Sequence, residues 1–141
     1  MNELYSICWN ITNKCNENCK FCYRKICDDN SLDENKKIFD NISQIKIDKI
    51  TFSGGEPLLY EDLFKLADYI KSKNHEIKLS LTTNAQMITD ELFDRIINTF
   101  DWISFSIDSS NINVNDEIGR GKNHLEKIID LLDKFNNLLW S

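Results

Sequence analysis

The sequence is poor in the residues and segments that mark several classes of protein. Its 141 residues include one proline and four glycines, which excludes collagen-like chains and proline/glycine-rich disordered chains. No apolar run approaches the roughly 18 residues that a membrane-spanning helix needs. The N-terminal segment lacks the basic and apolar regions of a secretory signal peptide, so we expect a soluble, cytoplasmic protein without a membrane partner.

Positive charge is also scarce. Seventeen Lys and Arg residues face 23 Asp and Glu residues, which gives a formal net charge of -6. A chain of this sign is a poor match for nucleic acid or for an anionic membrane surface, so neither is expected as a partner. Its length suits a single domain with a real hydrophobic core, and we expect one domain over residues 1–141.

Short apolar strand-like runs alternate with helical periodicity along the chain, which is the pattern of βα units in a parallel sheet. The first helix opens with a capping box formed by Ser31 and Glu34. The polar stretch 108–122 is expected to be a loop, and the last helix carries an apolar stripe from Leu125 onward. The expected strands cover residues 4–11, 49–52, 77–81 and 102–107.

Each expected strand is followed directly by polar or turn-forming residues. These are a cysteine-rich loop, a turn containing Gly54 and Gly55, the stretch 82–84, and Asp108. In parallel βα folds the carboxyl ends of the strands meet at one edge, where the connecting loops gather. We therefore expect these four features to form a single functional site.

Three of the five cysteines lie within eight residues of one another. Cys15, Cys19 and Cys22 are separated by three and then two residues, and short spacings of thiolates in one loop are typical of iron–sulfur clusters. Three ligands on a four-iron cluster leave one iron open to an outside ligand. Zinc is the main rival, with Cys8 or Cys27 as a fourth ligand. We expect Cys8 to be buried in the core and Cys27 to be free.

The cysteine loop resembles the cluster-binding motif of the radical S-adenosylmethionine (SAM) superfamily. Phe21, an aromatic residue just before the third cysteine, is typical of that motif. The turn Gly54-Gly55-Glu56-Pro57 resembles the superfamily's GGE motif, which receives the methionyl amino group of SAM. The resemblance implies that the three cysteines hold a [4Fe–4S] cluster, and that Glu56 neutralises the ammonium group of SAM or accepts a hydrogen bond from it.

Four further positions match the superfamily at the ends of the later strands. The resemblance implies that Asn84 contacts the ribose of SAM, and that Ser106 and Asp108 lie on one face of the fourth strand, near the ribose or the carboxylate. It also implies that Arg120 lies near the SAM carboxylate. These positions complete the predicted cofactor-binding set.

Several other polar residues have simpler interpretations. His75 and His124 lie in polar connections and are expected on the surface. Lys20, Arg24 and Lys25 flank the cysteine loop and are expected to form a solvated cationic edge, where an acidic electron donor such as a flavodoxin or ferredoxin would dock.

The superfamily core has about six βα units, whereas this sequence holds four. The resemblance therefore implies the N-terminal part of a partial (β/α) barrel, incomplete at its C-terminal side, with an exposed fourth strand and a place for a completing subunit. Trp102 is expected in the core. The implied reaction is reductive cleavage of SAM followed by hydrogen abstraction from a substrate, such as a peptide or a cofactor precursor. The alternatives are an inactive fragment, an iron–sulfur or SAM-binding electron-transfer module, and a zinc-stabilised interaction domain.

Overall fold

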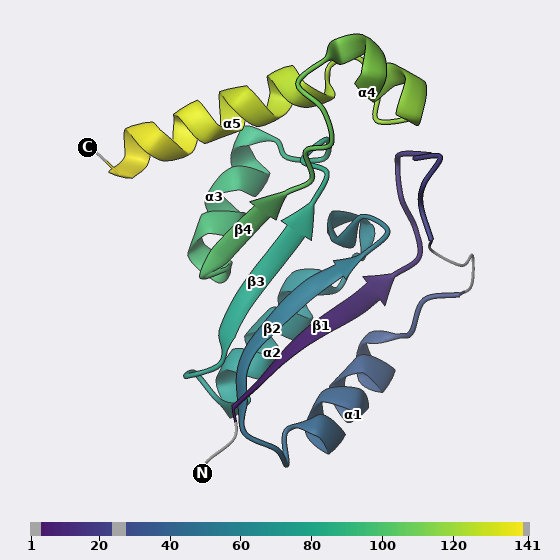
Figure 1. Ribbon diagram of the computed structural model, residues 1–141. Coiled ribbons are helices and arrows are strands. Elements are labelled where there is room, and N and C mark those ends of the chain that lie inside the picture. The colour runs from purple at the N-terminus through teal and green to yellow at the C-terminus, as the bar shows by residue number, and fades with distance from the viewer. Residues whose placement is uncertain (1–3, 24–27, 140–141) are drawn as a thin grey trace.

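A computed structural model describes residues 4–23 and 28–139 and shows a four-stranded, fully parallel sheet. The strands lie side by side in chain order, as Figure 1 shows. The expected α/β class and the four parallel units of a partial barrel are confirmed. The strands are β1 (Tyr5–Thr12), β2 (Ile47–Gly54), β3 (Lys78–Thr83) and β4 (Trp102–Phe105).

Helices connect the strands and begin where the sequence offers capping side chains. Ser31 forms the expected capping box with Glu34, and the hydroxyl of Thr89 accepts from the backbone N–H of Leu92. The helices are α1 (Leu32–Ile42), α2 (Leu63–Lys73), α3 (Asp90–Thr99), α4 (Ile112–Ile118) and α5 (His124–Leu139), with a 3-10 turn, η1, at Pro57–Leu59.

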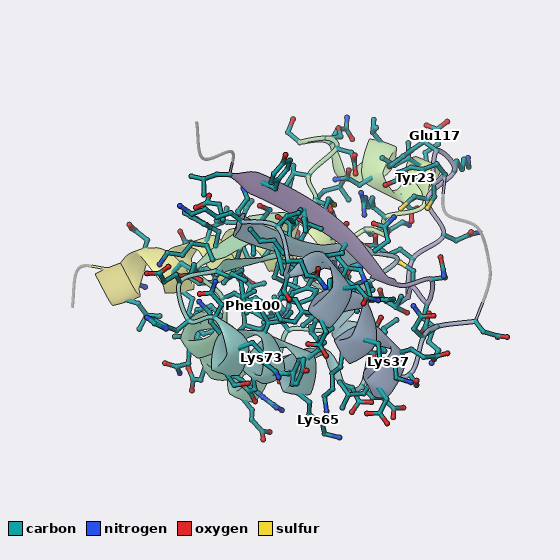
Figure 2. The ribbon with its side chains drawn as sticks, turned by 90° about the horizontal axis from the view of Figure 1, so that it is seen from below. Tyr23, Lys37, Lys65, Lys73, Phe100 and Glu117 are labelled. Atoms are coloured by element: carbon teal, nitrogen blue, oxygen red, sulfur yellow. The ribbon has the colours of Figure 1, made fainter. Side chains whose placement is uncertain are left out.

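Helices α1, α2 and α3 cover one face of the sheet (Figures 1 and 2). The core fills the space between them and includes fully buried Phe39, Phe52 and Phe93. Figure 2 places Lys37 and Lys65 on the outer side of the helices, where both are exposed. The stripes that the sequence predicts on these helices therefore face the sheet.

Within residues 4–23 and 28–139, the opposite face of the sheet carries no helix comparable to these three (Figure 1) and is rich in small polar residues. Cys8, on β1, is exposed, so the expectation that it is buried in the core is wrong. Trp102, on β4, is 52% exposed, and its expected burial is wrong as well. Both side chains point to the open face of the sheet, because successive residues of a strand point to opposite faces.

The stretch 108–122 is not a simple loop, because it contains α4. The side chain of Asn111 accepts from the backbone N–H of Asn113 and opens this helix, while Gly119 closes it in a left-handed conformation with φ of +94°. Strand β4 also ends at Phe105, two residues earlier than expected. Ser106 and Asp108 therefore leave the strand and do not share a strand face with Ser104.

None of the helices in the described part of the chain is both long and apolar enough to span a membrane.

Candidate cluster and cofactor site

The carboxyl edge of the sheet brings most of the predicted site residues to one pocket of about 200 Å³. Cys15, Cys19 and Cys22 line it together with the glycine turn after β2. The other predicted residues in its lining are Phe21, Asn84, Ser106 and Arg120. Glu56, Pro57 and Asp108 are not among the residues that line it. Tyr23 and Ser53 also line the pocket, and Thr82 adds the end of β3.

The cysteine loop leaves β1 and turns back on itself. The backbone N–H of Cys22 donates to the carbonyl of Cys19 at 3.0 Å, and the backbone N–H of Glu17 donates to Sγ of Cys15 at 3.5 Å. Cys15 and Cys19 are half-buried and Cys22 is exposed. Burial raises the pKa of the Cys19 thiol, while the nearby positive charge of Arg120 opposes that shift.

The chemistry of this donor set fits an iron–sulfur cluster. Within the described residues, no three His, Cys, Asp or Glu side chains converge closely enough to hold one metal ion. A cluster does not require such convergence, because each thiolate binds a different iron. Three thiols on one loop beside an open pocket fit that arrangement. Cys27 lies outside the described residues, as do Arg24 and Lys25.

The glycine turn packs directly against the start of the cysteine loop. The backbone N–H of Gly55 donates to the carbonyl of Thr12 and that of Glu56 donates to the carbonyl of Lys14, both at 2.8 Å. A Cβ atom on Gly55 would overlap the carbonyl oxygen of Lys14. The close approach of the two backbones therefore requires glycine at this position.

Glu56 is fully buried, and its carboxylate is engaged within the chain. Oε1 accepts from the hydroxyl of Thr83 at 2.7 Å and from the backbone N–H of Leu58 at 3.1 Å, and Oε2 accepts from the backbone N–H of Asn84 at 2.8 Å. Burial raises the pKa of Glu56 in spite of these bonds. The carboxylate thus ties the end of β2 to the end of β3.

Asn84 extends this connection to the cysteine loop. Its side-chain amide donates to Oδ1 of Asn16 at 2.7 Å and to Sγ of Cys15 at 3.8 Å. The next residue, Ala85, is buried with φ of +68°, an uncommon conformation for a residue with a Cβ atom. The turn after β3 is therefore shaped so that Asn84 reaches the loop.

Arg120 is 12% exposed and contacts three other parts of the site. Its Nη1 lies 2.7 Å from Oε2 of Glu17, and its Nε lies 2.5 Å from Oδ2 of Asp108. The guanidinium carbon lies 5.6 Å from the centre of the Phe21 ring. Asp108 therefore supports Arg120 in this structure.

Two residues of this region escaped the sequence interpretation. Glu17, between the first two cysteines, has a side chain that is 4% exposed, and His124 has one that is fully buried. The expectation that His124 lies on the surface is therefore wrong. The residues around His124, at the start of α5, do not indicate that its side chain is buried. Its neighbour in space, Glu17, lies more than a hundred residues earlier in the sequence.

The exit of the cysteine loop is held by Asp29. Its carboxylate accepts from the hydroxyl of Thr12 at 2.7 Å and from the backbone N–H of Asn13 at 2.8 Å. Burial alone would raise the pKa of Asp29, but these bonds and the charge of Lys14 outweigh it and lower the pKa. The loop thus begins and ends at the same point on β1.

A parallel β/α half-barrel with a three-cysteine loop and a glycine turn at its carboxyl edge defines a class of cluster-binding, SAM-dependent proteins. Residues 9–140 match the family model of the Radical SAM superfamily, and the chain belongs to this superfamily. The resemblance on which the sequence interpretation rests is confirmed. The cofactors of the superfamily are a [4Fe–4S] cluster and SAM, as predicted.

The similar proteins include enzymes with different named reactions. The chain is 33% identical to an S-adenosylmethionine-dependent nucleotide dehydratase of Thermoplasmatales archaeon (strain ISO4-H5), over 87% of this chain and 45% of the relative. It is 32% identical to the pre-heme d1 synthase of Dinoroseobacter shibae, over 72% of this chain and 26% of the relative. The chain thus spans less than half the length of these curated relatives.

Among solved structures, SuiB of Streptococcus suis bound to S-adenosylmethionine superposes with a TM-score of 0.76. The identity is 20%, over 94% of this chain and 31% of SuiB. At this level of identity the likeness establishes the fold.

Proposed function

We propose that this chain is the part of a radical SAM enzyme that binds the cluster and the methionine end of SAM. The observation that carries the proposal is the shared pocket: three cysteines of one loop line a single cavity at the carboxyl edge together with Gly54 and Gly55. The predicted extent of the domain, 1–141, its C-terminal incompleteness and its cytoplasmic location remain predictions.

In this proposal the residues of the chain divide the work between them. Cys15, Cys19 and Cys22 hold the cluster, while the close-packed glycine turn offers its backbone to the methionyl group. The chemistry that a bound and reduced cluster supplies is one electron for the C–S bond of SAM, which yields methionine and a 5′-deoxyadenosyl radical. Ser106 and Asn84 also line the pocket and orient the nucleoside part.

The electron must come from outside the chain, and we propose a flavodoxin- or ferredoxin-type donor. Phe21 is 55% exposed and Tyr23 is 86% exposed, so the rim of the pocket beside the cysteine loop is open to an approaching protein. An open rim permits the close contact that electron transfer requires.

The same sheet edge offers a surface for a substrate. Small polar residues on the open face pair across the strands, with Asn10 opposite Ser53 and Thr82 opposite Ser104. Ser53 and Thr82 also line the cofactor pocket. The polar face therefore continues from the cofactor site down the sheet, which suits hydrogen abstraction from a polar molecule.

For the substrate class we propose a nucleotide, which is the class named for the dehydratase that is 33% identical to this chain. The expectation from the sequence was a peptide or a cofactor precursor, and SuiB has been solved bound to its precursor peptide. The test is incubation with a mixture of nucleotides under reducing conditions. A nucleotide that loses one water supports the proposal, and no change in any nucleotide contradicts it.

Anaerobic reconstitution with iron and sulfide tests the cluster site. We expect charge-transfer absorbance near about 400 nm, typical of iron held by thiolates. The absorbance should vanish in the triple Cys→Ala variant of residues 15, 19 and 22. Cys8→Ala is the matched control, since Cys8 is an exposed thiol on β1, and should keep the absorbance. Stoichiometric zinc binding without iron uptake would contradict the proposal.

Formation of 5′-deoxyadenosine from SAM and dithionite tests the reaction itself. Product that depends on the three cysteines supports a radical SAM activity of this chain. A stable cluster without any product would favour the alternative, an iron–sulfur or SAM-binding module that requires a completing subunit for catalysis.

A further inference from the structure

Three ionisable side chains are packed together beneath the cysteine loop, and the superfamily motifs do not account for two of them. They are Glu17 within the loop, Arg120 after α4, and His124 at the start of α5. Their side chains are 4%, 12% and 0% exposed. Charges this far from solvent require partners, because an unpaired buried charge is strongly destabilising.

The Glu17 carboxylate lies between the other two side chains. Its Oε2 is 2.7 Å from Nη1 of Arg120, and its Oε1 is 3.2 Å from Nδ1 of His124. On the far side of the imidazole ring, Nε2 of His124 lies 2.7 Å from the carbonyl oxygen of Ser106. A carbonyl oxygen only accepts, so Nε2 carries the proton of this bond. On the near side, Nδ1 faces both the Glu17 carboxylate and the side-chain amide nitrogen of Gln86, which lies 3.3 Å away.

The backbone makes the same connection. The N–H of Lys20 donates to the carbonyl of Ile118 at 2.9 Å, and a Cβ atom on Gly119 would overlap the carbonyl oxygen of Asn18. In Figure 1 the loop after β1 lies beside α4, which follows β4 at the other end of the sheet. Side chains and backbone together join the first and the last strand of the sheet across the site.

We propose that Glu17 and His124 are positioning residues that fix the cysteine loop, and the Arg120 guanidinium beside Cys19, before any cluster is bound. The loop has little regular structure of its own, and most of its anchors are contacts with other segments. Where it concerns the properties of a bound cluster, the inference rests on the proposed function. The claim about the loop stands on the cluster-free chain alone.

Hydrogen exchange in the cluster-free chain tests the fixing of the loop. His124→Phe fills the same space without either nitrogen, and we expect the protection of the amides of residues 16–20 to fall by about tenfold. Glu17→Ala should have the same effect. His75→Phe, at an exposed position, is the matched control and should change nothing.

Two results would overturn the proposal. One is protection within about twofold of the wild type in both His124→Phe and Glu17→Ala while circular dichroism shows an intact fold. The other is global unfolding of both variants, which would assign these residues to the stability of the whole domain and not to the loop.

The reduction potential of the reconstituted cluster gives a readout that loosening of the loop does not imitate. Glu17→Gln removes a negative charge near the cluster and should raise the potential, whereas Arg120→Gln removes a positive charge and should lower it. Shifts of the same sign in both variants would contradict the proposed placement. If the wild-type chain takes up no cluster, the proposed function fails, and the exchange experiment still decides this inference.

Discussion

Glu56 shows how a single side chain takes a role that its motif does not reveal. The sequence interpretation assigned its carboxylate to the ammonium group of SAM, but the carboxylate is fully buried and accepts from Thr83, Leu58 and Asn84. Gly54 and Gly55 line the pocket, and Glu56 does not. The glycines of the turn line the pocket, and the acid bonds to the end of the next strand; its contact with SAM stays a prediction.

We expect Glu56→Gln to lower the free energy of unfolding by about 2 kcal/mol. A carboxylate accepts with both oxygens, whereas the glutamine NH₂ group would face either the N–H of Asn84 or the hydroxyl of Thr83, leaving a buried donor without an acceptor. Urea denaturation measures the difference. Glu61→Gln, at an exposed position four residues after the motif's proline, is the control and should be neutral. Equal stability of the two variants would contradict the role given to Glu56.

At the scale of elements, the turn after β2 meets the backbone at the start of the cysteine loop because Gly55 has no side chain. We expect Gly55→Ala to destabilise the fold by about 3 kcal/mol, since its Cβ would overlap a backbone oxygen that cannot move aside. Gly121→Ala is the contrasting variant. Gly121 has φ of +85° but open space around it, so only the conformational cost of about 1 kcal/mol applies. Thermal unfolding that ranks the two variants in the opposite order would refute this account.

Asp101 joins three elements at the opposite edge of the sheet. It accepts from the backbone N–H of Leu79 at 2.9 Å and from the ammonium groups of Lys78 and Lys71 at 3.0 and 3.1 Å. Burial alone would raise its pKa, but these donors outweigh it and lower the pKa to about 2. The carboxylate therefore stabilises the connection between α3 and β4 as long as it is ionised.

The lowered pKa gives Asp101 a definite pH dependence. Its stabilisation is present above the ordinary value of 3.8 and is lost as the pH falls through about 2. Because the residue is partly exposed, solvent screening limits the contribution to about 1 kcal/mol. Asp101→Asn should show that deficit at neutral pH and converge with the wild type as the pH falls from 3.8 to about 2. Asp68→Asn, at an exposed site on α2, is the control. If the stability deficit of Asp101→Asn does not change with pH, the charge of the Asp101 carboxylate is not its cause.

Over the whole molecule, the sheet ends at β4 with an apolar groove of about 430 Å³ between β4 and α5. Ile103, Phe105 and Phe135 form its floor, while Trp102 and Leu132 on its sides are about half exposed. Within the described residues, the apolar stripe of α5 is thus only partly buried. Solvent reaches apolar surface here that a longer sheet would cover.

The groove predicts binding of an apolar reporter by the purified 141-residue chain. An anilinonaphthalene sulfonate dye should fluoresce with it, and Leu132→Lys should reduce the signal because Leu132 lines the groove. Ile129→Lys is the matched control. Ile129 is 48% exposed on the same helix and lies outside the groove, so its replacement should leave the signal unchanged. Equal loss in both variants would show that the dye binds elsewhere.

The sequence by itself determined the order of strands and helices and the place of the cysteine loop. Hydrophobic periodicity is local, and so are the capping box at Ser31 and the spacing of Cys15, Cys19 and Cys22. Parallel connectivity then required the strand ends to meet at one edge, so the shared pocket followed from the order of elements. The sequence did not predict the helix within 108–122. This helix begins at the capping side chain of Asn111 and ends at Gly119, and it has no apolar stripe from which helical periodicity could be recognised.

Only the tertiary structure decided which charges are buried and what they hold. His124 was expected on the surface, and Cys8 and Trp102 in the core, yet the fold reverses each of these assignments. The burial of Glu17 was not predicted at all. The reason is physical. Burial depends on what the chain places on each face of the sheet, and the partner of a buried charge is chosen by proximity in space, which a pattern along the sequence does not contain.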